Sequence, residues 1–468
     1  VRAAESVPFE TLNIAVREGW AEQSPEMWWN FICDGVKDIS SRHSLSSVVC
    51  VGITYQMHGL VCVDRDGKPL RDSIIWCDSR AVELGAQAME ELGREKCLEH
   101  LLNSPGNFTA SKLAWVKENE PALYGKIHKI MLPGDYIAYK FSGDINTTGT
   151  GLSEGILWDF SHNRRADFVA EYFGIGSDKF ARVVPSIGEQ CRTSGEIESL
   201  LGIPKGTPVC YRAGDQPNNA FSLNVLNPGE VAATAGTSGV VYGVTDLPKA
   251  DSRSRVNTFL HVNHTAEAPR LGVLLCINGT GIMYSWMRRN FGTGLSYPQM
   301  NELAEDAPAG SDGLTVIPFG NGAERVLCNR IVGSGICGLD LVRHSTPHLL
   351  RATQEGIAFS FLYGIRIMKS LGLDLRVIRA GDANLFKSRL FCRTLSTLCG
   401  SSIELYNTDG SLGAARGAAL GAGFYRSPEE AFANLDTVAR VTPEISWKSP
   451  LEDAYGRWTD ELNKAITQ

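Results

Sequence analysis

The sequence has little that would carry the chain into a membrane, out of the cell or onto a nucleic acid. It contains no 18-residue apolar run, and its longest apolar stretches, such as GVLLCI at residues 272–277, have the length of a strand. Its first ten residues, VRAAESVPFE, lack the apolar core of a signal peptide. A formal net charge of −7 over 468 residues provides no basic surface for DNA or RNA. These absences predict a cytoplasmic protein whose partners are neither membranes nor nucleic acids.

The cysteines show no disulfide or metal-binding pattern. There are twelve of them, and no two form a Cys-x-x-Cys pair. Most lie in apolar, strand-like runs, as Cys50, Cys62, Cys210 and Cys276 do. We therefore expect reduced thiols that act as small buried hydrophobic residues, and the sequence assigns no metal ligands.

Several segments have clear helical patterns. Ser24 is a candidate N-cap, with Pro25 at the first helical position of a segment that continues to residue 39. Residues 348–372 form a long amphipathic pattern that ends at a glycine. Glycine and alanine dominate residues 410–425, which predicts a helix that packs closely against its neighbours.

The length and the order of these patterns predict two domains. A chain of 468 residues is too long for one comfortable hydrophobic core. Strand-like and helix-like segments alternate in both halves, which is typical of α/β domains. We expect the boundary between residues 216 and 230, with a ligand-binding cleft between the domains.

Three glycine-containing turns follow strand-like segments in the second half. The first contains Gly236 and Thr237, the second contains Gly279 ahead of a helix, and the third contains Gly381 and Asn384. Glycine lets a ligand approach the backbone, whose amides can bind phosphate oxygens. Ordinary chain reversal explains any one of these turns as well, but three of them at strand ends favour a nucleotide site. None of the three has the sequence of a P-loop or a Gly-x-Gly-x-x-Gly fingerprint, which argues against those two folds.

Polar side chains in the first half suit a polyol ligand. Gln56 and His58 lie in the bend between two predicted strands, and Trp76, Asp78 and Arg80 follow the end of another. An aromatic face beside several hydrogen-bonding groups is typical of a sugar site. The sequence also allows simpler roles, in which His58 is a structural histidine and Asp78 forms a local salt bridge with Arg80.

A carboxylate, Asp215, stands where a strand meets a helix. Residues 207–213 are strand-like, Gly214 interrupts the pattern, and Pro217 begins a segment compatible with a helix. The dipole and the free amides of a helix N-terminus favour an ionised carboxylate. Such an aspartate can take a proton from an attacking hydroxyl during phosphoryl transfer. The alternative is that Asp215 only caps the helix.

Eight short motifs follow one another along the chain. They are GWAEQSPEMWW, YQMHG, IIWCDSRA, SKLAWVKENEP, LPGDYI, AGDQPNNA, GTSG and TDGSLGAARGAALGAG. Some are modest alone, but the ordered set closely resembles the FGGY family of carbohydrate kinases. The motifs extend from about residue 18 to residue 425, so the resemblance covers nearly the whole chain.

This resemblance implies a fold and an activity. The fold would be α/β, with two ribonuclease-H-like domains of the actin and hexokinase superfamily flanking a catalytic cleft. Residues 1–222 would form the sugar-binding domain and residues 223–468 the ATP-binding domain. The activity would be phosphorylation of a small-molecule ketose with ATP and Mg²⁺, and D-xylulose is the expected ketopentose. Kinases of sedoheptulose or ribulose share this architecture, and a non-catalytic sugar- or nucleotide-binding relative is a further alternative. The resemblance leaves open whether the protein is a homodimer.

The resemblance also implies residue roles. Asp215 would accept the proton of the sugar's terminal hydroxyl. The expected sugar contacts are Gln56, Met57, His58, Trp76, Asp78 and Gln216. The expected ATP-binding residues are Gly236, Thr237, Gly279, Gly381 and Asn384.

The chain departs from the family pattern at two places. Where many relatives have Gly-Gly-Gly-Ala-Lys-Ser, this chain has the longer stretch AGDANLFKS, which leaves the adenine contacts open. Family members also begin with a strand and an Asp-x-Gly-Thr/Ser turn, whereas VRAAESVPFE resembles the middle of that first meander. We therefore expect a further segment of about 20 residues in the family pattern, the length of two short strands and a turn.

Overall fold

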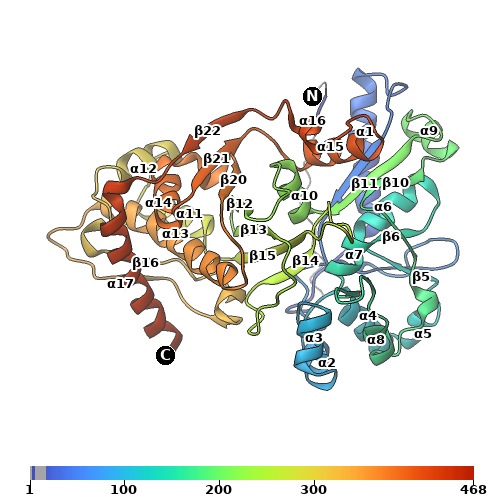
Figure 1. The fold of residues 1–468 in the computed structure, drawn as a ribbon, viewed down its shortest axis with the longest axis horizontal. Coiled ribbons are helices and arrows are strands. Elements are labelled where there is room, and N and C mark those ends of the chain that lie inside the picture. The colour runs from blue at the N-terminus through green and yellow to red at the C-terminus, as the bar shows by residue number, and fades with distance from the viewer. Residues whose placement is uncertain (1–2, 6–16, 468) are drawn as a thin grey trace.

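The computed structural model of the chain describes residues 3–5 and 17–467 and contains two α/β lobes side by side (Figure 1). The first half of the chain forms the right-hand lobe in this view, and most of the second half forms the left-hand lobe. The stretch VRAAESVPFE lies largely outside the described residues, so the expectation attached to it stays a prediction. Within the described part of the chain, no helix combines the length and the apolar composition that crossing a membrane requires.

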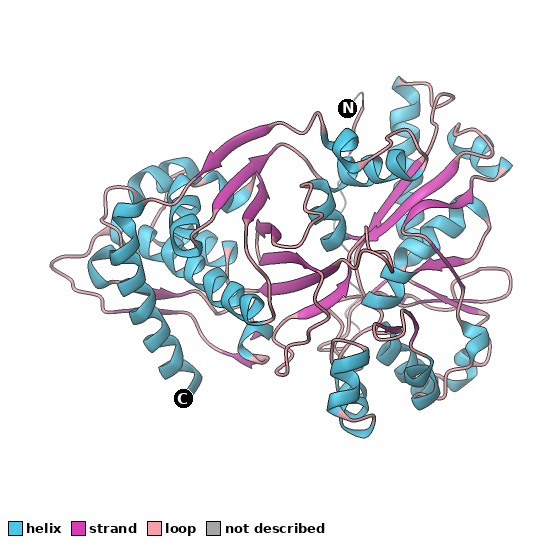
Figure 2. Cartoon of the chain, viewed as in Figure 1, coloured by secondary structure: helices cyan, strands magenta, loops and turns pink. Residues whose placement is uncertain are grey.

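A seven-stranded mixed sheet forms the centre of the left-hand lobe (Figure 2). Its strands, in spatial order, are β14 (Asn257–Leu260), β15 (Leu271–Ile277), β13 (Gly239–Thr245), β12 (Glu230–Ala235), β20 (Val377–Gly381), β21 (Ser402–Tyr406) and β22 (Thr437–Val441). β20 pairs in parallel with both β12 and β21, and the other neighbours are antiparallel. Parallel neighbours require a crossover, and a helix provides it between β20 and β21.

Helices of the same half complete this lobe. They are α11 (Gly281–Asn290), α12 (Tyr297–Ala304), α13 (Thr346–Ser370), α14 (Arg389–Cys399) and α17 (Lys448–Thr467). Two further helices of this half, α15 (Gly410–Gly421) and α16 (Pro428–Phe432), pack against the right-hand lobe instead. Short strands pair as β16 (Thr315–Ile317) with β19 (Gly335–Cys337) and β17 (Ala323–Glu324) with β18 (Arg330–Ile331). The long helix predicted near residues 348–372 is confirmed as α13.

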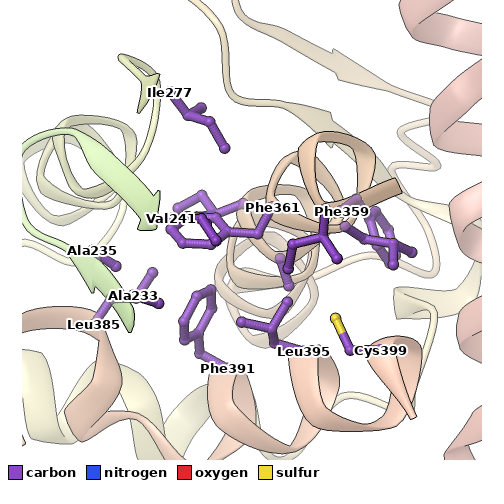
Figure 3. Packing of buried hydrophobic residues seen from close by; sticks show 14 of the residues in the cluster. Ala233, Ala235, Val241, Ile277, Phe359, Phe361, Leu385, Phe391, Leu395 and Cys399 are labelled. Carbon is purple, nitrogen blue, oxygen red and sulfur yellow. The ribbon is translucent and has the colours of Figure 1, made fainter. Parts of the chain in front are cut away.

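The core of this lobe lies between the sheet and helices α13 and α14 (Figure 3). Phe391, Leu395 and Cys399 repeat every four residues on α14, so one face of the helix is buried. The Phe391 ring meets Phe361 of α13 edge to face, with 5.8 Å between the ring centroids. Burying each large side chain of this kind contributes about 1.5–3 kcal/mol. This packing holds the ends of β12 and β20 in place.

The right-hand lobe is built on a smaller three-stranded sheet. Its strands, in order, are β10 (Ile187–Arg192), β11 (Pro208–Gly214) and β2 (Val51–Tyr55). β11 and β2 are parallel, and Gly214 lies opposite Tyr55. The carboxyl ends of these two strands therefore meet at one edge of the sheet, which brings the residues after Tyr55 next to those after Gly214.

Helices and short strand pairs surround this sheet. The helices are α1 (Pro25–Arg42), α2 (Val82–Glu91), α3 (Arg94–His100), α4 (Thr109–Asn119), α5 (Pro121–Tyr124), α6 (Pro133–Ser142), α7 (Gly149–Glu154), α8 (Asp167–Tyr172), α9 (Gly195–Leu201) and α10 (Asp215–Ser222). The strand pairs are β1 (Glu22–Gln23) with β4 (Ser73–Ile74), β3 (Val61–Val63) with β5 (Lys129–Met131), β6 (Asn146–Thr148) with β9 (Arg182–Val184), and β7 (Trp158–Asp159) with β8 (Arg164–Arg165). The predicted start of α1 is confirmed, because the Ser24 hydroxyl accepts a hydrogen bond from the Met27 amide at 3.4 Å.

One helix of the second half, α15, packs on the sheet of the first half (Figure 1). A Cβ on Gly52 of β2 would lie 2.1 Å from the carbonyl oxygen of Ala414, and a Cβ on Gly417 would lie 2.3 Å from the Tyr211 ring. Only glycine permits this approach, so the prediction of a closely packed small-residue helix is confirmed. Because the late segment around α15 returns to the first lobe, a single division of the chain at residues 222 and 223 stays a prediction.

Candidate active site

Asp215 is the first residue of α10 and directly follows β11. The side chain is open to solvent, but the protein around it excludes enough water to raise the pKa of the carboxyl group to about 6. Hydrogen bonds from Gln216 and from the backbone amide of Asp215 oppose this rise. At neutral pH the carboxylate is mostly ionised, and its pKa lies close to the working range of a general base.

Two side chains press against Gly214, the residue before Asp215. A Cβ at this position would lie 2.5 Å from Met57 Cγ and 2.6 Å from Glu154 Oε2, so any larger residue would displace these side chains. Glu154 is 2% exposed. Burial, together with the nearby charge of Asp215, raises the pKa of Glu154 well above its ordinary value. A buried carboxyl group with a raised pKa therefore lies beside the strand end that carries Asp215.

His58 is held in one orientation beside these residues. Its backbone φ is 63°, and its Nδ1 lies 2.9 Å from the carbonyl oxygen of Glu154. A carbonyl oxygen can only accept, so Nδ1 carries the proton and Nε2 is left as an acceptor. Burial and the adjacent Lys112 lower the pKa of His58 to about 3, which keeps the ring neutral. The ring also contacts Phe108 edge to face, with 4.8 Å between the centroids.

Lys112 on α4 connects the two segments that were expected to contact the sugar. Its ammonium group is fully buried and donates to the carbonyl oxygens of His58 at 2.8 Å and Ile75 at 2.9 Å. Burial lowers the pKa of Lys112 to about 7. The motif SKLAWVKENEP contains this lysine, but the sequence assigned it no role. Its partners are backbone atoms far away in the sequence, which no local pattern indicates.

Asp78 forms a salt bridge with Arg80, which was one of the alternatives that the sequence allowed. Its carboxylate is fully buried, lies 2.7 Å from Arg80 Nη2 and accepts a hydrogen bond from the backbone amide of Ala21 at 2.6 Å. Arg80 also pairs with Glu22 at 2.6 Å and lies over the Trp20 ring at 3.8 Å. The structure therefore places Asp78 in a buried ion pair, which orients the segment around it.

The other expected sugar contacts differ in their positions. Gln216 follows Asp215 on α10, so the structure brings it to the same strand edge as Met57 and His58. Gln56 lies at that edge too, and its Nε2 donates to Gln23 Oε1 at 2.7 Å. The side chain of Trp76 is 60% exposed, beyond the end of β4.

A cavity of about 820 Å³ opens in the left-hand lobe beside the turn between β12 and β13. This volume is within the range of small-molecule and cofactor sites. Of the five expected ATP-binding residues, Gly236, Thr237 and Asn384 line the cavity. Gly279 and Gly381 are not among the lining residues.

The first two glycine turns are joined by backbone hydrogen bonds at the N-terminus of α11. The amide of Gly281 donates to the carbonyl oxygen of Gly236, and the amide of Ile282 donates to that of Thr237, both at 3.0 Å. A Cβ on Gly281 would lie 2.1 Å from the Gly236 oxygen, so this contact requires glycine. The two turns therefore form one rigid wall of the cavity.

The turn that contains Gly279 is hydrogen-bonded to Glu324. The amides of Gly279 and Asn278 donate to the two carboxylate oxygens of Glu324, each at 2.9 Å. Burial raises the pKa of Glu324 to about 7. A Cβ on Gly279 would lie 2.3 Å from the carbonyl oxygen of Pro318, which shows that the turn is packed tightly.

Other cavity residues were missed by the sequence. They include Tyr284, Tyr297, Asn301, Glu302, Lys387 and Arg389. Tyr284 lies one helical turn after Gly281, so its position could have been predicted. Asn301 lies on α12, and only the packing of α12 against α13 brings it to the cavity.

One stretch outside the three turns, residues 333–338, has the spacing Gly-x-Gly-x-x-Gly. It contains β19, which pairs antiparallel with β16, and the next helix begins only at residue 346. A dinucleotide fingerprint requires a strand followed at once by a helix, so this stretch lacks the necessary context.

Both lobes match models of one protein family. Residues 2–222 match the N-terminal domain of the FGGY family of carbohydrate kinases, and residues 231–425 match its C-terminal domain. Together the two matches cover most of the chain.

Individual relatives agree with this match. The chain is 28% identical over 437 residues to a xylulose kinase of Bacillus subtilis, covering 89% of this chain and 83% of that protein. The structure resembles that of a xylulose kinase from Rhodospirillum rubrum, with a TM-score of 0.87, 23% identity, and coverage of 97% and 93% of the two chains. It also resembles a Plasmodium falciparum glycerol kinase with ADP, with a TM-score of 0.85, 20% identity, and coverage of 97% and 92%. These structural similarities show a shared two-lobed fold.

Proposed function

Because the chain belongs to the FGGY family of carbohydrate kinases, we propose that it phosphorylates a ketopentose with MgATP, and that D-xylulose is its substrate. The product would be D-xylulose 5-phosphate. The xylulose kinases among the relatives support this choice of sugar. A cytoplasmic setting, where ATP and sugar phosphates both occur, is part of the same proposal.

Asp215 is the general base of the proposed reaction. The carboxylate takes the proton from the terminal hydroxyl of the sugar as that oxygen forms a bond to the γ-phosphorus of ATP. The bond between this phosphorus and the β–γ bridging oxygen breaks, and ADP leaves. The observation that carries the proposal is the solvent-accessible, mostly ionised Asp215, at the strand edge it shares with Met57 and His58.

The sugar and the nucleotide would bind to opposite lobes. Met57, His58, Gln56 and Gln216 supply the sugar side, and the neutral His58 offers Nε2 to a sugar hydroxyl. The bonded wall of glycine turns that contains Gly236 would hold the nucleotide. Mg²⁺ would arrive with ATP as part of the substrate, and it neutralises charge on the phosphates.

The test is a panel of sugars assayed for ADP release with MgATP. The panel contains D-xylulose, D-ribulose, sedoheptulose and glycerol, and a reaction without sugar measures background ATP hydrolysis. We expect the highest kcat/KM with D-xylulose. A higher value for another ketose would overturn the choice of sugar, and the absence of sugar-dependent ADP release would overturn the kinase proposal.

A further inference from the structure

A buried chain of hydrogen bonds lies behind the 820 Å³ cavity. It runs from the start of α14 through Ser388 and Gln354 to Tyr284 and Asn301. Ser388 and Gln354 are fully buried, and Tyr284 is 3% exposed. Only Tyr284 and Asn301 of this chain reach the cavity wall. The direction of these hydrogen bonds decides which atom the protein presents to a ligand.

The first step of this chain has a fixed direction. The amide of Phe391 can only donate, and it donates to Ser388 Oγ at 3.3 Å. The proton of the Ser388 hydroxyl then needs an acceptor, and an atom of the Gln354 amide lies 2.5 Å away. This distance is typical of a hydroxyl bonded to an oxygen and is short for a nitrogen. The Gln354 atom is therefore Oε1, which settles the orientation of its amide group.

The remaining steps follow from the orientation of Gln354. Its Nε2 can only donate, and it lies 2.8 Å from Tyr284 Oη and 3.2 Å from the Asn301 side chain. The Tyr284 hydroxyl donates a hydrogen bond to the same atom of Asn301 at 2.9 Å. An atom that accepts from two donors is the amide oxygen, so Oδ1 of Asn301 is saturated. The Nδ2 group of Asn301 is left with its protons directed away from the network.

We propose that Asn301 is a base-recognition residue of the nucleotide site, whose Nδ2 donates a hydrogen bond to a ring nitrogen of adenine. This inference rests on the proposed use of ATP. The cavity wall around Asn301 also contains Ile282, Leu385 and the ring of Tyr297, which provide apolar surface for a planar base. Gln354 would act as a positioning residue, because its hydrogen bond to Oδ1 of Asn301 fixes the orientation of the Asn301 amide group.

The experiment is a double-mutant cycle between the protein and the nucleotide. Dissociation constants are measured by calorimetry for ADP and for its 1-deaza, 3-deaza and 7-deaza analogues, each of which lacks one ring acceptor. We expect Asn301→Ala to weaken ADP binding by about three- to tenfold, the size of one hydrogen bond. One analogue should lose a similar factor with the wild-type protein and almost nothing further with the variant, because both changes remove the same bond.

Asn290→Ala is the matched control. Asn290 is an exposed asparagine on α11 whose side chain donates to Trp286 of its own helix at 2.8 Å. This variant should bind ADP like the wild type, and circular dichroism should show that both variants are folded. If the affinity lost through Asn301→Ala and the affinity lost with each deaza analogue simply add, Asn301 does not bond a ring nitrogen. That result would overturn the inference while leaving the kinase proposal intact. A wild-type protein that binds no ADP would instead overturn the proposed use of ATP.

Discussion

The two sides of the proposed active site are built by different means. On the sugar side, the ionisable side chains of Asp78 and Lys112 are buried, Asp78 in an ion pair with Arg80 and Lys112 in hydrogen bonds to two backbone carbonyl oxygens. On the nucleotide side, glycine turns and a neutral network ending at Asn301 form the wall of an open cavity. Buried charges are costly unless they are paired or hydrogen-bonded, so they persist where the structure holds them firmly.

This difference suggests how each side tolerates change. A small sugar that must deliver one hydroxyl to a base requires precise placement, which buried charges can enforce. A nucleotide offers a large surface and a flat base, so backbone amides and shape can supply much of its binding, with the buried carboxylate of Glu324 bonded to the turn that carries Gly279. Changes on the sugar side should therefore affect turnover and sugar affinity, and changes on the nucleotide side should affect nucleotide affinity alone.

The largest effect should come from Asp215→Asn. Removing a general base should lower kcat by about 10²- to 10⁴-fold, while the dissociation constant of ADP stays within about twofold. For the wild-type protein, kcat should fall as the pH drops through about 6, because the carboxylate becomes protonated. Both quantities come from steady-state kinetics and calorimetry. Wild-type kcat in the variant would mean that Asp215 is not the base.

The next effect should come from Lys112→Met, which keeps most of the side-chain length but removes the ammonium group. The carbonyl oxygens of His58 and Ile75 would then be left without this donor, and each such loss costs about 1–3 kcal/mol. The loops should shift, and the KM for the sugar should rise by about tenfold with ADP binding unchanged.

Lys117→Met is the control for this change. Lys117 lies on the same helix and also donates to two carbonyl oxygens, those of Phe173 at 2.8 Å and Gly174 at 2.7 Å. These contacts lie away from the segments expected to bind the sugar, so the KM should not change. Equal effects of the two substitutions on the KM would contradict a special role for Lys112.

A smaller effect should separate two glycines on the nucleotide side. In Gly281→Ala the new Cβ would lie 2.1 Å from the Gly236 oxygen, so the bonded turns must move apart. This variant should lose both stability and ADP affinity, by about threefold or more. A Cβ on Gly381 would meet its nearest neighbour, the Thr408 oxygen, at 4.0 Å, so Gly381→Ala should fold normally.

The same pair tests the predicted role of Gly381. If its backbone touches the nucleoside, Gly381→Ala should weaken ADP binding without lowering the melting temperature. Thermal unfolding and calorimetry on both variants provide the two measurements. Unchanged ADP affinity in Gly381→Ala would remove this residue from the ATP site.

Features set by short segments could be predicted from the sequence. Asp215 lies at the expected junction of strand and helix, because the strand pattern, Gly214 and Pro217 are all local signals. The salt bridge between Asp78 and Arg80 was recognised as an alternative for the same reason, since its partners are two residues apart.

Roles that depend on distant contacts could not be predicted. Glu154 gains its raised pKa from burial against the strand end before Asp215, and nothing near it in the sequence indicates this. Asn301 is defined by a network that joins four separate segments. Gly279 was expected at the nucleotide, but its amide is bound by Glu324, 45 residues later in the chain.

The smallest expected effect concerns the stability of the sugar side. Burial raises the pKa of Asp215 to about 6 in the folded protein, whereas an unfolded aspartate has a pKa of about 3.9. Between these values the folded state binds more protons, so the wild-type protein loses stability as the pH rises from about 4 to 6. Asp215→Asn removes this loss, so it should melt about 1–4 °C higher than the wild type at pH 7 and at nearly the same temperature at pH 4.

Asp251→Asn should have the opposite effect. Burial alone would raise the pKa of Asp251, but the hydrogen bonds from Arg255 outweigh it, so the pKa is lowered. That variant should be less stable than the wild type at pH 7, with the difference shrinking as the pH falls. Melting curves of the wild type and the two variants from pH 4 to pH 8 test both signs. If the difference in melting temperature between Asp215→Asn and the wild type does not change with pH, it does not come from the titration of Asp215.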